Sequence, residues 1–192
     1  MIDSEADASK AQPESGAHVT RTGQGTHRVE LWGNLPVGWL SNFTRGTARM
    51  SLDIVRGVAR RSPLRRWSAT FEMRGTSDAI VQRIDFLELA RVGGESPLSI
   101  PLELLRFDLT RSTEREGTLE LRVGAPDRVG FLAALLGHLA GFVLFPDEIR
   151  IDTFQNEADD ALFLTSLGGQ RPPVQLEAAL RASLRLCTRD RA

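Results

Sequence analysis

Apolar and polar residues alternate along several short stretches of the chain, a pattern typical of strands with one buried face. In the first of them, Val29 and Leu31 alternate with polar neighbours and with Trp32. We therefore predict strands at about residues 27–33, 52–60, 67–73, 105–109, 119–124, 148–153 and 161–166.

Between these stretches, apolar residues recur at spacings of three and four, which predicts amphipathic helices. We expect helices at about residues 39–50, 77–93, 129–140 and 176–184, with Ser77 as the cap of the second and Gly93 at its end. A short strand is expected at the end of the chain, at Leu186 and Cys187. The predicted order is β, α, β, β, α, β, and it occurs twice. This indicates an α+β protein of two ferredoxin-like βαββαβ domains with antiparallel sheets.

Three correspondences between the halves share one spacing of 92 residues. They are Val37-Gly38 with Val129-Gly130, Trp39-Leu40 with Phe131-Leu132, and Phe71 with Phe163. A constant offset combined with a repeated element order indicates duplication of a domain. We predict a first domain at 27–112 and a second at 113–192.

Composition separates the first 26 residues from the rest, because they contain no Leu, Phe or Trp. Such a segment buries too little apolar surface to offset its ordering entropy, so we predict a disordered tail at 1–26. The tail lacks the apolar core that a signal peptide has. Along the whole sequence, no apolar run approaches the length needed to span a membrane. With one cysteine, Cys187, no internal disulfide can form. We expect a cytoplasmic protein.

At the turn after each first strand the sequence resembles the ACT family. Residues 125–132 (APDRVGFL) look like the family's Asp-x-Pro-Gly-Leu-Leu junction, and residues 160–165 look like its third strand. The similarity covers about 117–187 and is closest to the tandem ACT domains that end bacterial nitrogen-sensing uridylyltransferases. The first half departs from the pattern, with Leu35 where the family favours Asp and Val37 where it favours Pro.

The resemblance implies a regulatory protein that binds an amino acid or similar small effector at a domain interface. The ligand-binding residues it implies are Asp127, Arg128, Val129, Gly130, Phe131 and, in the first half, Gly38. Glycine allows close approach of the backbone, and helix N-termini favour a carboxylate. Asp127 can hold a ligand ammonium group or cap the following helix.

Two further functions stay open. The first is an ACT-like assembly module without a ligand, pairing as a homodimer or with a partner protein. Trp32, an apolar ring on a polar strand face, is its candidate interface residue. The second is RNA binding through the arginines between Arg56 and Arg66, but the third strands lack the expected aromatic pattern. A net charge of -1 adds no general attraction to nucleic acid.

Catalytic motifs are absent from the sequence. It has no Gly-x-Gly-x-x-Gly, phosphate-binding lysine loop, His-Glu-x-x-His or Gly-x-Ser-x-Gly. The three histidines, among them His138, have no metal-ligand spacing. We expect no enzymatic activity, metal or cofactor.

Overall fold

The structure is a computed structural model that describes residues 15–75, 78–92 and 100–188. Its strands are β1 (Gly16–Gly23), β2 (Thr26–Gly33), β3 (Asp53–Arg61), β4 (Trp67–Arg74), β5 (Arg106–Arg111), β6 (Leu119–Pro126), β7 (Leu144–Phe154) and β8 (Glu157–Ser166). Its helices are α1 (Trp39–Arg49), α2 (Asp78–Val81), α3 (Phe86–Val92), α4 (Phe131–Ala140) and α5 (Val174–Leu186), with a 3-10 turn at Leu167–Gly169.

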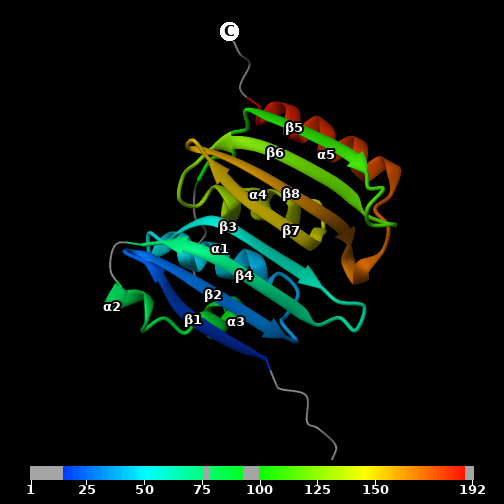
Figure 1. The fold of residues 1–192 in the computed structure, drawn as a ribbon. Coiled ribbons are helices and arrows are strands. Elements are labelled where there is room, and N and C mark those ends of the chain that lie inside the picture. The colour runs from blue at the N-terminus through cyan, green and yellow to red at the C-terminus, as the bar shows by residue number, and fades with distance from the viewer. Residues whose placement is uncertain (1–14, 76–77, 93–99, 189–192) are drawn as a thin grey trace, which may run out of the picture.

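All eight strands join one antiparallel sheet in the order β1-β2-β4-β3-β7-β8-β6-β5. Helices α1 and α4 lie behind this sheet in Figure 1, and the opposite face is open. The α+β class and the antiparallel sheet are therefore confirmed. None of the described helices is long and apolar enough to cross a membrane.

Each half has the order ββαββα rather than the predicted βαββαβ. The strand beside β2 is β1, and the strand beside β6 is β5, so each precedes its partner in the chain. We expected the strand at 105–109 to complete the first half, but it pairs with the second. A hairpin needs only a short connection, which explains why the edge position goes to the preceding strand.

The prediction of a disordered tail to residue 26 is wrong for residues 16–23, which form β1. This strand lies at the edge of the sheet, and only Ala17 and Val19 pack against the core. Backbone hydrogen bonds to β2 order a segment that lacks large apolar side chains. The first 14 residues of the predicted tail lie outside the described part of the chain.

The two halves meet at β3 and β7, which run antiparallel and are equivalent strands. Val58 pairs with Arg150, and these residues are 92 apart (150 − 58). The same offset separates Gly38 from Gly130 (130 − 38). A local two-fold axis therefore passes through the Val58–Arg150 pair, and each half presents the same surface to the other.

One of the three predicted correspondences is wrong by one residue. Phe71 lies in the core against Trp39 and Phe43. Phe163 lies on the open face of the sheet instead, beneath the Arg150 guanidinium at 4.8 Å. Leu162 takes the place of Phe71, at an offset of 91 (162 − 71), because a one-residue shift in a strand exchanges its two faces.

Two further element predictions need correction. The helix predicted to run to Gly93 is broken, since α2 ends at Val81 and α3 begins at Phe86; Ser77 and Gly93 lie outside the described residues. Phe86 and Ala90 are buried, whereas Ile80 of the predicted stripe is exposed. Leu186 belongs to α5, and Cys187 ends that helix instead of forming a strand.

Candidate functional site

The turns before α1 and α4 are equivalent and have the same backbone form. Gly38 and Gly130 each stand at the N-cap position with φ of 80° and 89°. L-amino acids with side chains rarely adopt this left-handed conformation, which explains the glycine at each turn. Each turn lines a cavity together with residues of the opposite half.

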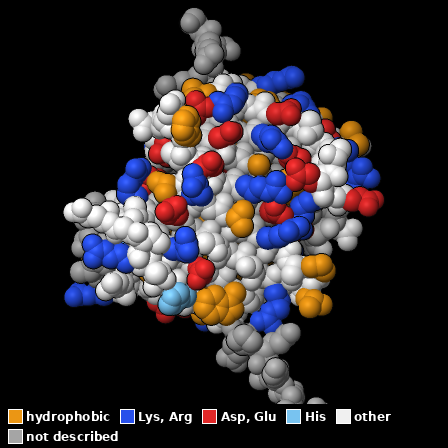
Figure 2. Space-filling model, in the orientation of Figure 1, with side chains coloured by type: hydrophobic (Ala, Val, Ile, Leu, Met, Phe, Trp, Pro, Cys, Tyr) orange, Lys and Arg blue, Asp and Glu red, His pale blue; other side chains and the backbone are white. Residues whose placement is uncertain are grey.

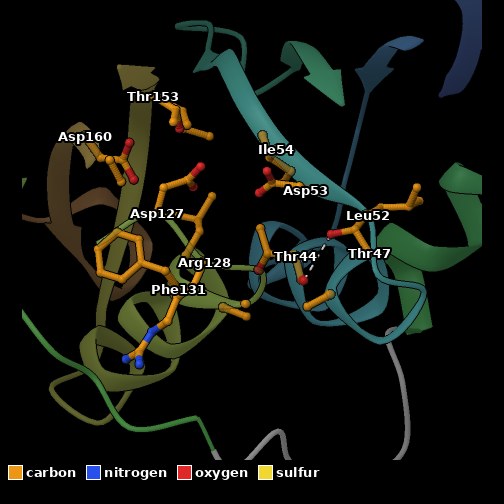
Figure 3. Close-up of a pocket in the computed structure, with 16 residues that line it drawn as sticks. Thr44, Thr47, Leu52, Asp53, Ile54, Asp127, Arg128, Phe131, Thr153 and Asp160 are labelled. Carbon is orange, nitrogen blue, oxygen red and sulfur yellow. Dashed lines mark hydrogen bonds between the residues drawn. The ribbon is translucent and has the colours of Figure 1, made fainter. Parts of the chain in front are cut away.

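The cavity at the second turn is small, about 30 Å³. Asp127, Arg128, Gly130 and Phe131 line it, as does Thr47 of α1 (Figure 3). Of the predicted ligand-binding residues in this turn, only Val129 is not part of the wall. A volume of this size holds about one water molecule. The structure thus brings the predicted residues together around a space that is almost filled.

Residues 100–103 of the connection to β5 lie against this second turn. A Cβ at Gly130 would overlap the end of the Ile100 side chain. Arg128 donates a hydrogen bond to the Pro101 carbonyl and lies 3.6 Å from the Glu103 carboxylate. The chain itself therefore occupies the approach to Gly130.

Three carboxylates gather at the same cavity, and Figure 3 shows Asp127 between Asp160 and Asp53. Burial raises the pKa of Asp127, the Asp53 charge raises it further, and Arg74 at 3.9 Å opposes the rise. Burial raises the pKa of Asp160 to about 8. Asp127 does not cap the helix, because α4 has no side-chain cap hydrogen bond.

The cavity at the first turn is much larger, about 380 Å³. Gly38 and the rest of the turn form one wall of it. Residues of α4 and the start of β7, including Leu136, Gly137 and Asp147, form the opposite wall. Pockets of about 300–1,000 Å³ are usual for small-molecule ligands. This cavity has the size of a ligand site, and both halves contribute to it.

Two tryptophan rings and one ion pair line this larger cavity. Trp39 and Trp67 contact edge to face, with ring centroids 5.2 Å apart. Arg61 Nη1 lies 3.1 Å from Asp147 Oδ1 in a mostly buried ion pair that joins β3 to β7. Of the predicted site residues only Gly38 is here. Arg61 stands in the predicted basic cluster and pairs with Trp67 across β3 and β4. The local motifs give no signal for Asp147, because it meets Arg61 only once β3 pairs with β7.

Trp32 lies on the open face of β2, as the alternation predicted, and is half-buried. Its ring covers Gly16 in β1, where a Cβ would come within 2.5 Å of the ring. The ring therefore packs within the protein, on a segment that lies in the predicted tail. An additional role of Trp32 in an interface stays a prediction.

Three of the five arginines between Arg56 and Arg66 lie beside acidic groups. Arg56, Arg60 and Arg61 pair with Asp152, Glu148 and Asp147 at 3.0–3.1 Å. Figure 2 shows positive and negative side chains interspersed over the open face. A phosphate backbone would have to displace these pairs, which disfavours the RNA-binding hypothesis.

His138 lies 3.1 Å from Ser183 Oγ, and burial lowers its pKa. This contact joins α4 to α5 and lines neither of the cavities described above. In the described part of the chain, no group of His, Cys, Asp and Glu residues is arranged to hold a metal ion.

Comparison with protein-family models finds no match, and comparison with curated proteins finds none. Among solved structures, the chain is similar to aspartate kinase from Synechocystis, with a TM-score of 0.48 and 17% sequence identity. The similarity covers 85% of this chain and 27% of the kinase chain. The chain thus matches about a quarter of that enzyme's length, and its candidate site is defined by its own geometry.

Proposed function

We propose that the protein is a non-catalytic regulatory module of two ACT-like domains that binds a small effector between its halves. The observation that carries the proposal is the 380 Å³ cavity at the first turn. One half supplies its wall from residues 35–42 and the other from residues 136–147. The size, the shared walls and the turn glycine are all consistent with an effector site.

The first turn is the better site of the two, although the second turn looks more like the family motif. The space at the second turn is about 30 Å³, and Ile100 lies against Gly130. At Gly38, by contrast, an added Cβ would meet nothing within 4 Å. The first turn is therefore open to a ligand, and the second is covered by the chain itself.

A ligand in this cavity contacts both halves, so its binding energy depends on how they are arranged. Arg61 in β3 and Asp147 in β7 already connect the halves at the cavity wall. Any change in the packing of α1 against α4 alters the same wall. This dependence is the physical basis of an allosteric coupling, which is typically ~1–3 kcal/mol.

The test is the thermal stability of the protein in the presence of a panel of amino acids and other small carboxylates and amines. A ligand at 100 times its dissociation constant adds about 2.7 kcal/mol of stability. For a chain of this size, that raises the melting temperature by ~5–10 °C. We expect at least one compound to produce such a shift.

The Gly137→Leu variant shows whether the shift comes from this cavity. Gly137 lines the cavity within α4, and a Cβ added there meets no atom within 4 Å. The variant should fold, since leucine favours a helix more than glycine does, and it should lose the shift. Gly137→Ala is the matched control and should keep it. A shift that survives in Gly137→Leu, or no shift with any compound, would contradict the proposal.

An assembly module without a ligand is the second candidate, and the sheet edges favour it. β1 and β5 stand at the two ends of the sheet, where a strand has backbone groups that no neighbouring strand pairs. In β5, Arg181 of α5 already donates to the Leu109 carbonyl. Addition of a strand from a partner or a second copy would use the remaining groups. Homodimerisation and effector binding are compatible, because the edges and the cavity are separate.

A further inference from the structure

Two residues in the wall of the larger cavity have a buried hydrogen-bond donor without a partner in the described part of the chain. Trp39 is 1% exposed and lines the cavity, yet its indole Nε1 has no hydrogen-bond partner among the described residues. Arg61 Nε is also buried and lacks such a partner. An unsatisfied buried donor costs ~1–3 kcal/mol. Both atoms have almost no accessible surface in this structure, so a ligand that offers acceptor atoms would recover this energy once the cavity wall adjusts to admit it.

The backbone adds donors on the same side. Helix α1 begins at Trp39, has no side-chain cap and has no acidic residue in its first turn. The first N–H groups of a helix lack partners within the helix, and the helix dipole favours negative charge there. In α1 the Trp39 N–H donates to the Pro36 carbonyl at 3.1 Å, so the donors at this end are the N–H groups of Leu40 and Ser41. The helix end and the buried Trp39 donor both belong to the first turn.

The side-chain acceptors of Asp147 and Asn42 in the cavity wall already interact with arginines of the protein. Asp147 is the one carboxylate among the lining residues, and it pairs with Arg61 Nη1 at 3.1 Å, which leaves Arg61 Nε as the donor of this guanidinium without a partner among the described residues. Asn42 Oδ1 accepts a hydrogen bond from Arg45 at 2.8 Å. Two arginines and one aspartate give the wall a net charge of +1 (2 − 1). A ligand with a single negative charge would balance it.

The two turns differ in the residue that would face an ammonium group. The second turn has Asp127 where the first has Leu35, at the common offset of 92 (127 − 35). Leu35 is 5% exposed and lines the cavity with Leu136, Leu144 and Phe145. The larger cavity is thus apolar at the position where an amino acid would need a carboxylate.

We infer that the effector of the larger cavity is a monocarboxylate with an apolar body and no amino group. This inference rests on the proposed function and specifies its ligand. The carboxylate lies by the Trp39 indole, Arg61 and the start of α1. The apolar body lies against Leu35 and the leucines of the opposite half.

The test compares three probes that share one apolar body: 3-phenylpropionate, phenylalanine and 3-phenylpropylamine. Calorimetric titration of the full chain should show 3-phenylpropionate binding at least tenfold more tightly than phenylalanine and the amine not binding. Gly137→Leu should abolish the binding of 3-phenylpropionate. Tighter binding of phenylalanine or of the amine, lost in Gly137→Leu, would overturn the inference and leave the effector site standing.

Two arginine variants test the position of the carboxylate. Arg61→Gln should weaken 3-phenylpropionate at least tenfold. Arg65→Gln, at an exposed position on the same hairpin, changes the net charge equally and should leave the affinity unchanged. Equal effects of the two variants would overturn the inference.

The reverse substitution tests the ligand class. Leu35→Asp gives the first turn the carboxylate of the second and should shift the preference towards phenylalanine. If Leu35→Asp does not fold, the Arg61 and Arg65 comparison decides. If none of the three probes binds, the inference fails. The proposed function fails with it only if no compound of the wider panel gives a thermal shift that depends on Gly137.

Discussion

Asp160 is a carboxylic acid in a position that an alanine holds in the other half. It is 2% exposed and, at an offset of 91 (160 − 69), corresponds to Ala69 in the core. Its Oδ1 has no hydrogen-bond partner among the described residues. Burial in this position raises its pKa from 3.8 to about 8.

The raised pKa of Asp160 predicts how stability depends on pH. Between pH 3.8 and about 8 the unfolded chain loses this proton while the folded protein keeps it. The Asp160 carboxyl group therefore stabilises the folded state most at low pH. Its stability should decrease by up to ~1.4 kcal/mol per pH unit as the pH rises towards 8, and then level off.

The variant that removes this titration is Asp160→Asn. Denaturant unfolding from pH 5 to 8 should show the variant gaining stability over the wild type as the pH increases. The carboxylates near Asp160, namely Asp127, Asp152 and Asp159, are unchanged in this comparison. A difference that stays constant with pH would show that Asp160 does not keep its proton in the folded state.

At the scale of elements, a buried glutamate connects β3 to β7 on the open face of the sheet. Glu148 has a side chain that is 5% exposed and lies 2.6–3.1 Å from Arg60, Arg115 and Arg150. The central pairing of the sheet thus combines backbone hydrogen bonds with an ion network. Loss of the Glu148 charge leaves three arginines close together without their shared partner.

We expect Glu148→Gln to reduce the free energy of unfolding by about 1–3 kcal/mol. Asp152→Asn is the matched control on the same strand, because the pair of Asp152 with Arg56 is 58% and 67% exposed at a similar distance of 3.0 Å. An exposed pair contributes about 0–1 kcal/mol. Equal losses in urea unfolding would mean that the network does not stabilise the junction.

The elements also show how far the sequence predicts the structure. The turn glycines are found at the predicted spacing, because a left-handed backbone restricts the choice of residue. The edge strand β1 was missed, since its side chains carry little hydrophobic signal and its order comes from pairing with β2. The partner of β5 could not be predicted, because alternation reveals a strand and not its neighbour.

The same limit applies to the candidate site. The sequence indicated the turn at Asp127 and Gly130, where the family pattern is clearer, and the structure covers that turn with Ile100. The larger cavity depends on Arg61 and Asp147, which are brought together by the pairing of β3 with β7. Such contacts between distant segments leave no periodic pattern in either of them.

At the scale of the whole molecule, the two halves form one sheet around a local axis and have unequal cavities. One cavity is about 30 Å³ and the other about 380 Å³, although their turns share one backbone form. Duplicated surfaces thus enclose very different volumes. The second turn is closed by the chain, and the first is available to an effector that contacts both halves.

The most direct test of effector binding at the first turn is a tryptophan fluorescence titration of the Trp32→Phe variant. The chain has three tryptophans, and the remaining Trp39 and Trp67 both line the larger cavity. Titration with the effector found in the thermal panel should give a saturable change in emission. Its midpoint should match the calorimetric affinity, and Gly137→Leu should abolish the change. Binding that leaves the emission of both tryptophans unchanged would place the effector elsewhere and contradict the account.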